Sequence, residues 1–268
     1  MATRLEIVGG GRMGEALVVG LLGAGWAGPE EMVVVEPVAA RRDQLAARFP
    51  GLGLSGTAVA ADGAVLAVKP VDAEAACRAI AGAGAGAGAA RVLSIVAGVP
   101  TARLQEWLDS EVPVVRAMPN TPALVGAGAA AIAPGATAGE ADLDWAQAIL
   151  GAVGVVQRVP ESALDAVTGL SGSGPAYVFL VAEALIEAGV LNGLPRSTAT
   201  ALAIQTLLGS ARLLAESGDT PEGLRAAVTS PGGTTAAGLR VLELRAVRSA
   251  FLEAVTAASD RSRELGQG

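Results

Sequence analysis

The fold of this chain is decided by residues 5–14, which read Leu-Glu-Ile-Val-Gly-Gly-Gly-Arg-Met-Gly. The first four residues predict a short buried strand, and the apolar spacing from about Arg12 to Leu22 predicts a helix. Gly9, Gly11 and Gly14 lie between them with the spacing G-x-G-x-x-G. In a strand–turn–helix context this spacing allows a tight turn, close approach of a pyrophosphate and close helix–strand packing. We therefore predict a dinucleotide-binding turn, with the phosphates at the helix start, and a chance glycine turn as the alternative.

An acid after the second apolar run bears on the choice of nucleotide. Met32 to Val35 predicts a strand, and Glu36 follows it about twenty residues after the glycine turn. A carboxylate there accepts hydrogen bonds from the adenosine ribose and repels a 2′-phosphate. Arg41 and Arg42 lie a turn further on and could offset that repulsion. The pattern favours NADH without excluding NADPH; the alternative is an exposed acid at a helix start with two solvated arginines.

The first half of the chain alternates short apolar runs with helix-compatible stretches. Further strands are predicted at Ala64 to Val68, Val92 to Val96 and Val112 to Val115, with helices at Ala39 to Phe49, Asp72 to Ala79 and Thr101 to Leu108. This alternation predicts a parallel, doubly wound α/β sheet of the Rossmann type, in which ligands bind outside the carboxyl ends of the strands. The predicted rim comprises Gly9–Met13, Glu36, Val68–Pro70, Ala97–Gly98 and Met118–Pro122. The alternating glycine and alanine residues at 81–90 are interpreted as a surface loop.

Composition excludes several classes of function. The net charge is −7 and basic runs are absent, which argues against nucleic acid and anionic membranes as partners. Histidine is absent and Cys77 is the only cysteine, so we expect no metal site and no histidine-based triad. No run of about twenty apolar residues is evident, and the N-terminus enters a strand directly. We therefore expect a soluble cytoplasmic protein.

The second half of the chain changes to long helices. From about Glu161 the strand-like runs stop, and Ser173-Gly174-Pro175 predicts the start of a helix that ends at Gly189. The helix predicted from Pro195 to about Glu216 is apolar on nearly every face, so it must be covered all round. We predict burial against a second subunit. The expected domains are 1–159, which binds the dinucleotide, and 160–268, which is all-helical.

Four stretches resemble the motifs of pyrroline-5-carboxylate reductases. They are Val115-Arg116-Ala117-Met118-Pro119-Asn120-Thr121-Pro122, Asp165–Phe179, Ala188-Gly189-Val190 with Gly193-Leu194-Pro195-Arg196, and Thr229–Gly238. The resemblance implies reduction of 1-pyrroline-5-carboxylate to L-proline with NADPH or NADH, the last step of proline biosynthesis. It also implies a substrate-binding and dimerisation role for the helical domain, and dimers that assemble further, up to a decamer.

The resemblance assigns roles to particular residues. Those implied to hold the cofactor are Gly9, Gly10, Gly11, Arg12, Met13, Glu36, Val68, Lys69, Pro70, Ala97, Asn120 and Thr121. Those implied to hold the substrate are Glu161, Ser230, Gly232, Gly233, Thr234 and Thr235, with Thr235 placed at the ring nitrogen. Two positions depart from the family pattern. Arg12 replaces an uncharged polar residue, and Glu36 replaces a small residue suited to a 2′-phosphate.

Hydride transfer to a cyclic imine is compatible with a chain that lacks histidine. A protonated imine is already an electrophile, so the protein supplies orientation and electrostatics. We hypothesise that Thr235 orients the imine and assists its protonation while the Gly232-Gly233 turn and the following helix start hold the carboxylate. As an alternative, Ser230 and Thr234 are helix caps and Thr235 is a first-turn residue.

Two other functions are compatible with the same two-domain fold. A hydroxyacid or broader imine dehydrogenase usually has a lysine or another strong acid or base in its helical domain, whereas Lys69 is the only lysine here. A nucleotide-sensing regulator would not need the loop at Gly232 to Thr235.

Overall fold

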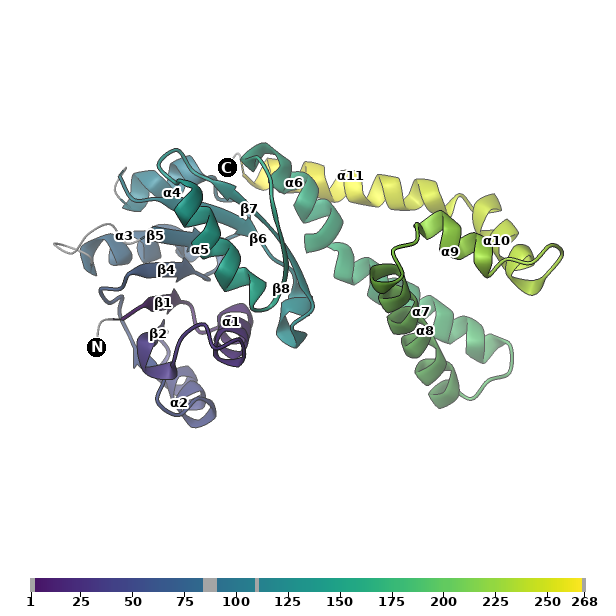
Figure 1. The fold of residues 1–268 in the computed structure, drawn as a ribbon, viewed down its shortest axis with the longest axis horizontal. Coiled ribbons are helices and arrows are strands. Elements are labelled where there is room, and N and C mark those ends of the chain that lie inside the picture. The colour runs from purple at the N-terminus through teal and green to yellow at the C-terminus, as the bar shows by residue number, and fades with distance from the viewer. Residues whose placement is uncertain (1–2, 84–90, 109–110, 267–268) are drawn as a thin grey trace. The chain divides into compact units, whose positions relative to one another are not determined.

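The computed structural model describes residues 3–83, 91–108 and 111–266. The chain forms two compact units, one of residues 1–173 with 256–268 and one of residues 174–255 (Figure 1). Of the expected loop at 81–90, residues 81–83 belong to helix α3, and 84–90 lie outside the described residues.

The described part of the first unit contains one eight-stranded sheet with the order β3-β2-β1-β4-β5-β6-β7-β8. The strands are β1 Leu5–Val8, β2 Met32–Val35, β3 Gly53–Ser55, β4 Gly63–Leu66, β5 Arg91–Ser94, β6 Val114–Met118, β7 Gly128–Pro134 and β8 Gly154–Arg158. Every pairing is parallel except that of β6 with β7. The order reverses beside β1, as in a doubly wound sheet, which confirms the predicted fold. The strand predicted at Val112 begins two residues later, because Pro113 has no N–H to give to the ladder.

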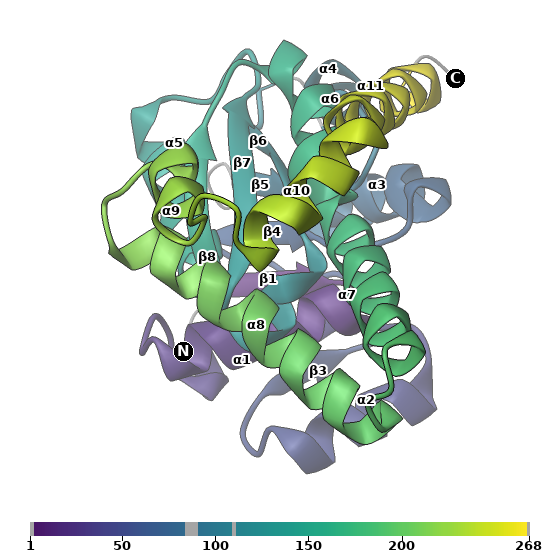
Figure 2. The same cartoon turned by 90° about the vertical axis from the view of Figure 1, so that its right-hand side faces the viewer.

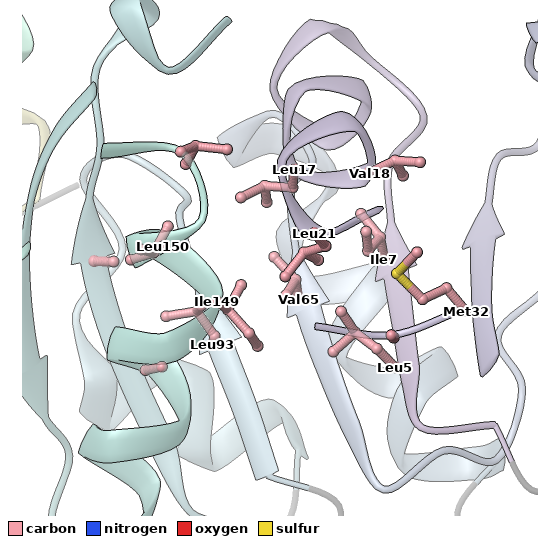
Figure 3. Packing of buried hydrophobic residues seen from close by; sticks show 14 of the residues in the cluster. Leu5, Ile7, Leu17, Val18, Leu21, Met32, Val65, Leu93, Ile149 and Leu150 are labelled. Carbon is pink, nitrogen blue, oxygen red and sulfur yellow. The ribbon is translucent and has the colours of Figure 1, made fainter. Parts of the chain in front are cut away.

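Helices cover both faces of this sheet. Helices α1 (Arg12–Gly23), α2 (Ala39–Arg48) and α5 (Glu140–Gly151) bury side chains in one apolar cluster, and α3 (Ala73–Ala83) and α4 (Thr101–Leu108) in another. Figure 3 shows side chains of α1 and α5 lying over Leu5, Ile7 and Val65 of the strands. The buried residues of the two clusters are aliphatic apart from Met32 and Cys77, so the stability of this unit depends mainly on the buried area of Leu, Ile, Val and Ala.

The tryptophans lie at the margins of this core, each under an arginine. The guanidinium of Arg4 lies 4.1 Å from the ring centroid of Trp26. Arg91 lies over Trp145 and Arg103 over Trp107, at 5.6 and 5.8 Å. These distances are in the range of cation–π interactions. The large rings are therefore anchored at the surface of the unit rather than used to fill its centre.

The second unit consists of helices. Helix α7 (Gly174–Leu191) and helix α8 (Arg196–Glu216) pack together as a hairpin (Figure 2). They are followed by α9 (Pro221–Ala227) and α10 (Thr234–Leu244), and α11 (Val247–Leu265) runs on into the first unit. The helices predicted from Ser173 to Gly189 and from Pro195 to Glu216 are confirmed to within two residues at each end.

Helix α7 begins at Gly174, as predicted, and further helical turns come directly before it. A short 3₁₀ turn at Glu161–Ala163 leads into α6 (Leu164–Val167) and the π-helical turn η5 (Thr168–Gly172), which continues into α7. The Ser173 N–H donates to the Thr168 carbonyl, five residues back, at 2.8 Å. Such a π turn rearranges the carbonyls just before Pro175, whose missing N–H would otherwise break a regular helix.

This continuity makes one long helical segment, in which charged residues such as Asp165 and Glu183 still interrupt the apolar runs. By length and composition alone, the helical segment Glu161–Leu191, 31 residues, could cross a membrane, and its most apolar window is unburied in the described chain. Its exposed apolar face requires a partner of some kind.

Candidate functional site

The glycine turn between β1 and α1 has the shape that a dinucleotide phosphate needs. Gly9 has a φ of +115°, and a side chain there would meet the Ala67 carbonyl oxygen at 2.5 Å. A side chain on Gly14 would lie 2.1 Å from the Gly9 carbonyl oxygen. Gly11, in contrast, has no atom within 4 Å of the place a side chain would take. The first and third glycines therefore allow close packing, and the second leaves open space in front of the first turn of α1, where the N–H groups of a helix have no partner within the helix.

The residues beside this turn divide between core and solvent. Met13 packs against the apolar cluster under α1, whereas Arg12 is exposed at the helix start. Val68, after β4, reaches the turn, since its Cγ1 lies 3.3 Å from the side-chain position of Gly9. The structure thus brings the turn and the end of β4 together, as the sequence predicted.

Glu36 reaches back to the same turn. Its Oε2 accepts a hydrogen bond from the Gly10 N–H at 3.1 Å, and its Oε1 accepts one from the Val38 N–H at 3.0 Å. The neighbouring arginines are also engaged. Arg41 donates to the Gly10 carbonyl at 2.7 Å, and Arg42 donates to the carbonyls of Glu36 and Pro37. The carboxylate therefore lies at the end of β2, where a ribose would be read.

A cavity of about 660 Å³ opens at the carboxyl ends of β4 and β5 within the first unit. Pro70 and Ala97, two of the predicted cofactor residues, line it, together with Arg103 and Trp107 of α4. Lys69 is exposed beside Pro70 and is absent from the lining. Residues of α11, among them Arg261 and Ser262, also line it, whereas the glycine turn and Glu36 do not, so its size suits a ligand but its lining does not include the predicted phosphate site.

Asn120 has a clear structural role in the first unit. Its Oδ1 accepts from the Ala129 N–H of β7 at 2.9 Å, and its Nδ2 donates to the Ser171 carbonyl of η5 at 3.0 Å. Thr121 follows as the first residue of the 3₁₀ turn η3 (Thr121–Val125) and is exposed. The amide therefore fixes the strand end beside which Thr121 lies.

Glu161 forms an ion-pair cluster that the sequence did not reveal. Its carboxylate accepts from the Thr101 N–H at 2.8 Å, the Thr101 hydroxyl at 2.6 Å and Arg116 Nη1 at 3.0 Å. Burial acts to raise the pKa of Glu161, but the Thr101 hydrogen bonds and the charge of Arg116 outweigh it and lower the pKa. The cluster joins residues far apart in sequence, and a charged Arg116 within a strand of apolar residues was the only available signal for it.

The predicted substrate loop lies in the second unit, before α10. Gly232 has a φ of +71°, which favours glycine, and a side chain on Gly233 would lie 2.4 Å from Ser230 Oγ. The Gly233 N–H donates to the Ser230 carbonyl at 3.0 Å, closing the turn. Gly233 precedes the helix without any side-chain cap, and Thr234 and Thr235 are exposed in its first turn. The turn thus presents helix-start N–H groups and two hydroxyls to solvent, the arrangement that a carboxylate prefers.

Comparison with known proteins covers the whole chain. Residues 161–265 match the family described as pyrroline-5-carboxylate reductase dimerisation, and residues 4–98 match the family described as NADP oxidoreductase coenzyme F420-dependent. A pyrroline-5-carboxylate reductase of Synechocystis sp. is 46% identical over 270 residues, covering 100% of both chains. One from Corynebacterium melassecola is 42% identical, covering 99% of each.

Solved structures give the same result. A pyrroline-5-carboxylate reductase from Coxiella burnetii has a TM-score of 0.92 and 37% identity, and the match covers 99% of each chain. A Plasmodium falciparum pyrroline carboxylate reductase with NADP bound has a TM-score of 0.83 and 31% identity, with 98% of each chain covered. Given identities of this size over the full length, the chain belongs to the pyrroline-5-carboxylate reductase family.

Proposed function

We propose that this protein reduces 1-pyrroline-5-carboxylate to L-proline with NADPH or NADH, the last step of proline biosynthesis. The observation that carries the proposal is the uncapped turn at Ser230–Thr235, which suits a small carboxylate, in a chain that also has an open dinucleotide turn at Gly9–Gly14. Full-length relatives with the same activity in their names support it.

The chain's own residues hold the two reactants. Gly9, Gly10 and Gly11 with Arg12 and Met13 receive the phosphates, and Glu36 receives the ribose. Val68, Lys69, Pro70, Ala97, Asn120 and Thr121 are the further cofactor residues that we propose, at or near the carboxyl ends of the strands. When bound, the nicotinamide supplies the hydride for the imine carbon.

The loop before α10 holds the substrate. The N–H groups at the start of the helix bind the carboxylate, with help from the helix dipole. Gly232 and Gly233 let the backbone come close, and Ser230 and Thr234 add hydroxyls. The Thr235 hydroxyl forms a hydrogen bond with the ring nitrogen and so orients the imine; the nitrogen takes its proton from solvent, and the adjacent carbon accepts the hydride. Glu161 is the further substrate residue that we propose, and in the first unit its carboxylate accepts hydrogen bonds from Thr101 and Arg116.

Substitution of Thr235 tests this mechanism. We expect Thr235→Ala to lower kcat/KM by about 100-fold, because the imine loses a hydrogen-bonding partner, and Thr235→Ser to keep most of the activity. The matched control is Thr220→Ala. Thr220 caps α9 by accepting from the Gly223 N–H at 3.2 Å, so its loss should lower stability by about 1 kcal/mol and leave the kinetics unchanged. Wild-type turnover and KM in Thr235→Ala would remove Thr235 from the mechanism.

We also propose that the protein works as a homodimer in the cytoplasm, with dimers assembling further into a decamer. The support for a dimer is the unburied apolar surface of α7 and the match of residues 161–265 to a dimerisation family. The start of that match also supports a functional boundary near Val159-Pro160, with 1–159 binding the cofactor and 160–268 the substrate. The short segment 160–173 nonetheless packs with the first unit.

A further inference from the structure

The end of β2 is built around one carboxylate. Glu36 is half-buried, and each of its oxygens accepts a backbone hydrogen bond, from Gly10 and from Val38. The Val38 N–H is a donor at the start of α2 that a 2′-phosphate could otherwise use. Pro37, immediately before it, has no N–H to offer. The Glu36 carboxylate therefore lies where a 2′-phosphate would have to bind. It also accepts from the Val38 N–H, a donor that the 2′-phosphate would need.

The cations that could neutralise this carboxylate are held elsewhere. Arg42 Nη1 donates to the carbonyls of Glu36 and Pro37, at 2.7 and 2.9 Å. Arg41 donates through Nε to the Gly10 carbonyl and through Nη2 to Glu15 Oε2, at 2.7 and 2.5 Å. Neither guanidinium forms an ion pair with Glu36 in the described chain. Both arginines therefore hold the backbone around the turn in place through these hydrogen bonds.

The ion pair with Glu15 holds the Arg41 side chain in this position. Its carboxylate, which lies on α1, also pairs with Arg48 of α2 and is only 15% exposed. Burial acts to raise the pKa of Glu15, but the two arginines outweigh it and lower the pKa, so Glu15 is ionised at neutral pH. An ionised, doubly paired carboxylate competes with any phosphate for Arg41.

We infer that Glu36 and the Glu15–Arg41 pair make the adenosine end of this site select NADH over NADPH. The inference rests on the proposed binding of a dinucleotide at Gly9–Gly14. Glu36 accepts hydrogen bonds from the ribose hydroxyls of NADH, and it repels the 2′-phosphate of NADPH. Glu15 prevents Arg41 from screening that repulsion.

The test is calorimetric titration of the full-length protein with NADH and with NADPH, without substrate. We expect wild type to bind NADH about tenfold more tightly than NADPH or better. Glu36→Gln should bring the two dissociation constants within about threefold of each other, mainly by strengthening NADPH binding. Glu15→Gln should strengthen NADPH binding several-fold with little change for NADH, and adding Arg41→Ala should remove that gain.

The matched control is Glu74→Gln, which removes the same charge from an exposed ion pair with Arg78 on α3. Its ratio of dissociation constants should equal that of wild type. Equal or tighter binding of NADPH by wild type, or an unchanged ratio in Glu36→Gln, would overturn the inference. NADH-selective binding without turnover of 1-pyrroline-5-carboxylate would uphold it and refute the proposed reaction instead.

Discussion

At the scale of single residues, Glu6 is an unusual member of the sheet. It lies in the middle of β1, 2% exposed, and its Oε2 accepts a hydrogen bond from the Val59 N–H at 3.1 Å. Burial raises its pKa from 4.5 to about 6, although the hydrogen bond acts to lower it. The folded state therefore holds this proton more tightly than the unfolded chain does, so the stabilisation is complete below pH 4.5 and is lost as the pH rises through 6.

Glu6→Gln should remove that dependence. The shift corresponds to about 2 kcal/mol, so we expect the variant to be more stable than wild type by up to about this amount at pH 7, with no difference near pH 4. Urea unfolding of both proteins across this range measures it. Glu74→Gln, an exposed acid, should behave as wild type. If the stability of Glu6→Gln changes with pH as steeply as that of wild type, another group causes the pH dependence.

At the scale of elements, one hydrogen bond ties α6 to the end of α11. Ser262 Oγ donates to Asp165 Oδ1 at 2.7 Å, across 97 residues of sequence. Ser262 is 8% exposed, so this hydrogen bond lies in a poorly solvated place. If the hydroxyl were removed, the Asp165 carboxylate would lose a donor that water replaces poorly there. The bond attaches the last turns of the chain to the first unit.

Ser262→Ala should lower the free energy of unfolding by about 1 to 2 kcal/mol, because it removes a hydrogen bond to a charged group. Denaturant unfolding measures the loss, and Ser162→Ala, at an exposed residue of the turn Glu161–Ala163, is the control. A second variant, Asp165→Asn, separates charge from geometry, since an amide oxygen can still accept the bond. Stability equal to wild type in Ser262→Ala would mean that packing alone holds α11.

At the scale of the whole molecule, the second unit exposes more apolar surface than a monomer tolerates. Helix α7 has no buried residue in the described chain, although Phe179 and Leu180 lie on it at 61% and 65% exposure. On α8, Leu202 and Ile204 are similarly exposed. Continuous apolar surface of this kind indicates an interface with a second copy.

Leu202→Glu with Ile204→Glu should therefore convert the protein to monomers, because a buried unpaired carboxylate opposes association. Sedimentation velocity measures the mass. Val38→Glu, which adds a charge at an exposed apolar residue of the first unit, should keep the wild-type mass. A monomeric wild-type protein, or a doubly substituted variant that stays associated, would contradict this.

The sequence predicted the elements whose pattern is local and missed those that depend on pairing. Thr101–Leu108 and the buried strands have strong periodicity, and the structure confirms them. Strand β7 has the sequence Gly-Ala-Ala-Ala-Ile-Ala-Pro, which carries little strand propensity and is held by β6 and β8. Strand β3 is only three residues long. Both strands form because neighbouring strands of the sheet pair with them.

The same division applies to the candidate site. The glycine turn and Glu36 were readable because their spacing is itself the signal. The Glu15–Arg41 pair and the Glu161–Arg116 pair join residues 26 and 45 positions apart, which no local pattern encodes. For that reason the sequence left open how Glu36 and the two arginines divide their roles at the ribose.

The placement of the tryptophans provides a spectroscopic consequence. The chain has three, Trp26, Trp107 and Trp145, and all belong to the first unit. Their emission therefore reports on that unit alone, whereas the ellipticity at 222 nm is dominated by helices of both. Followed together during heating, the two signals separate the melting of the first unit from that of the helical second unit without any introduced label.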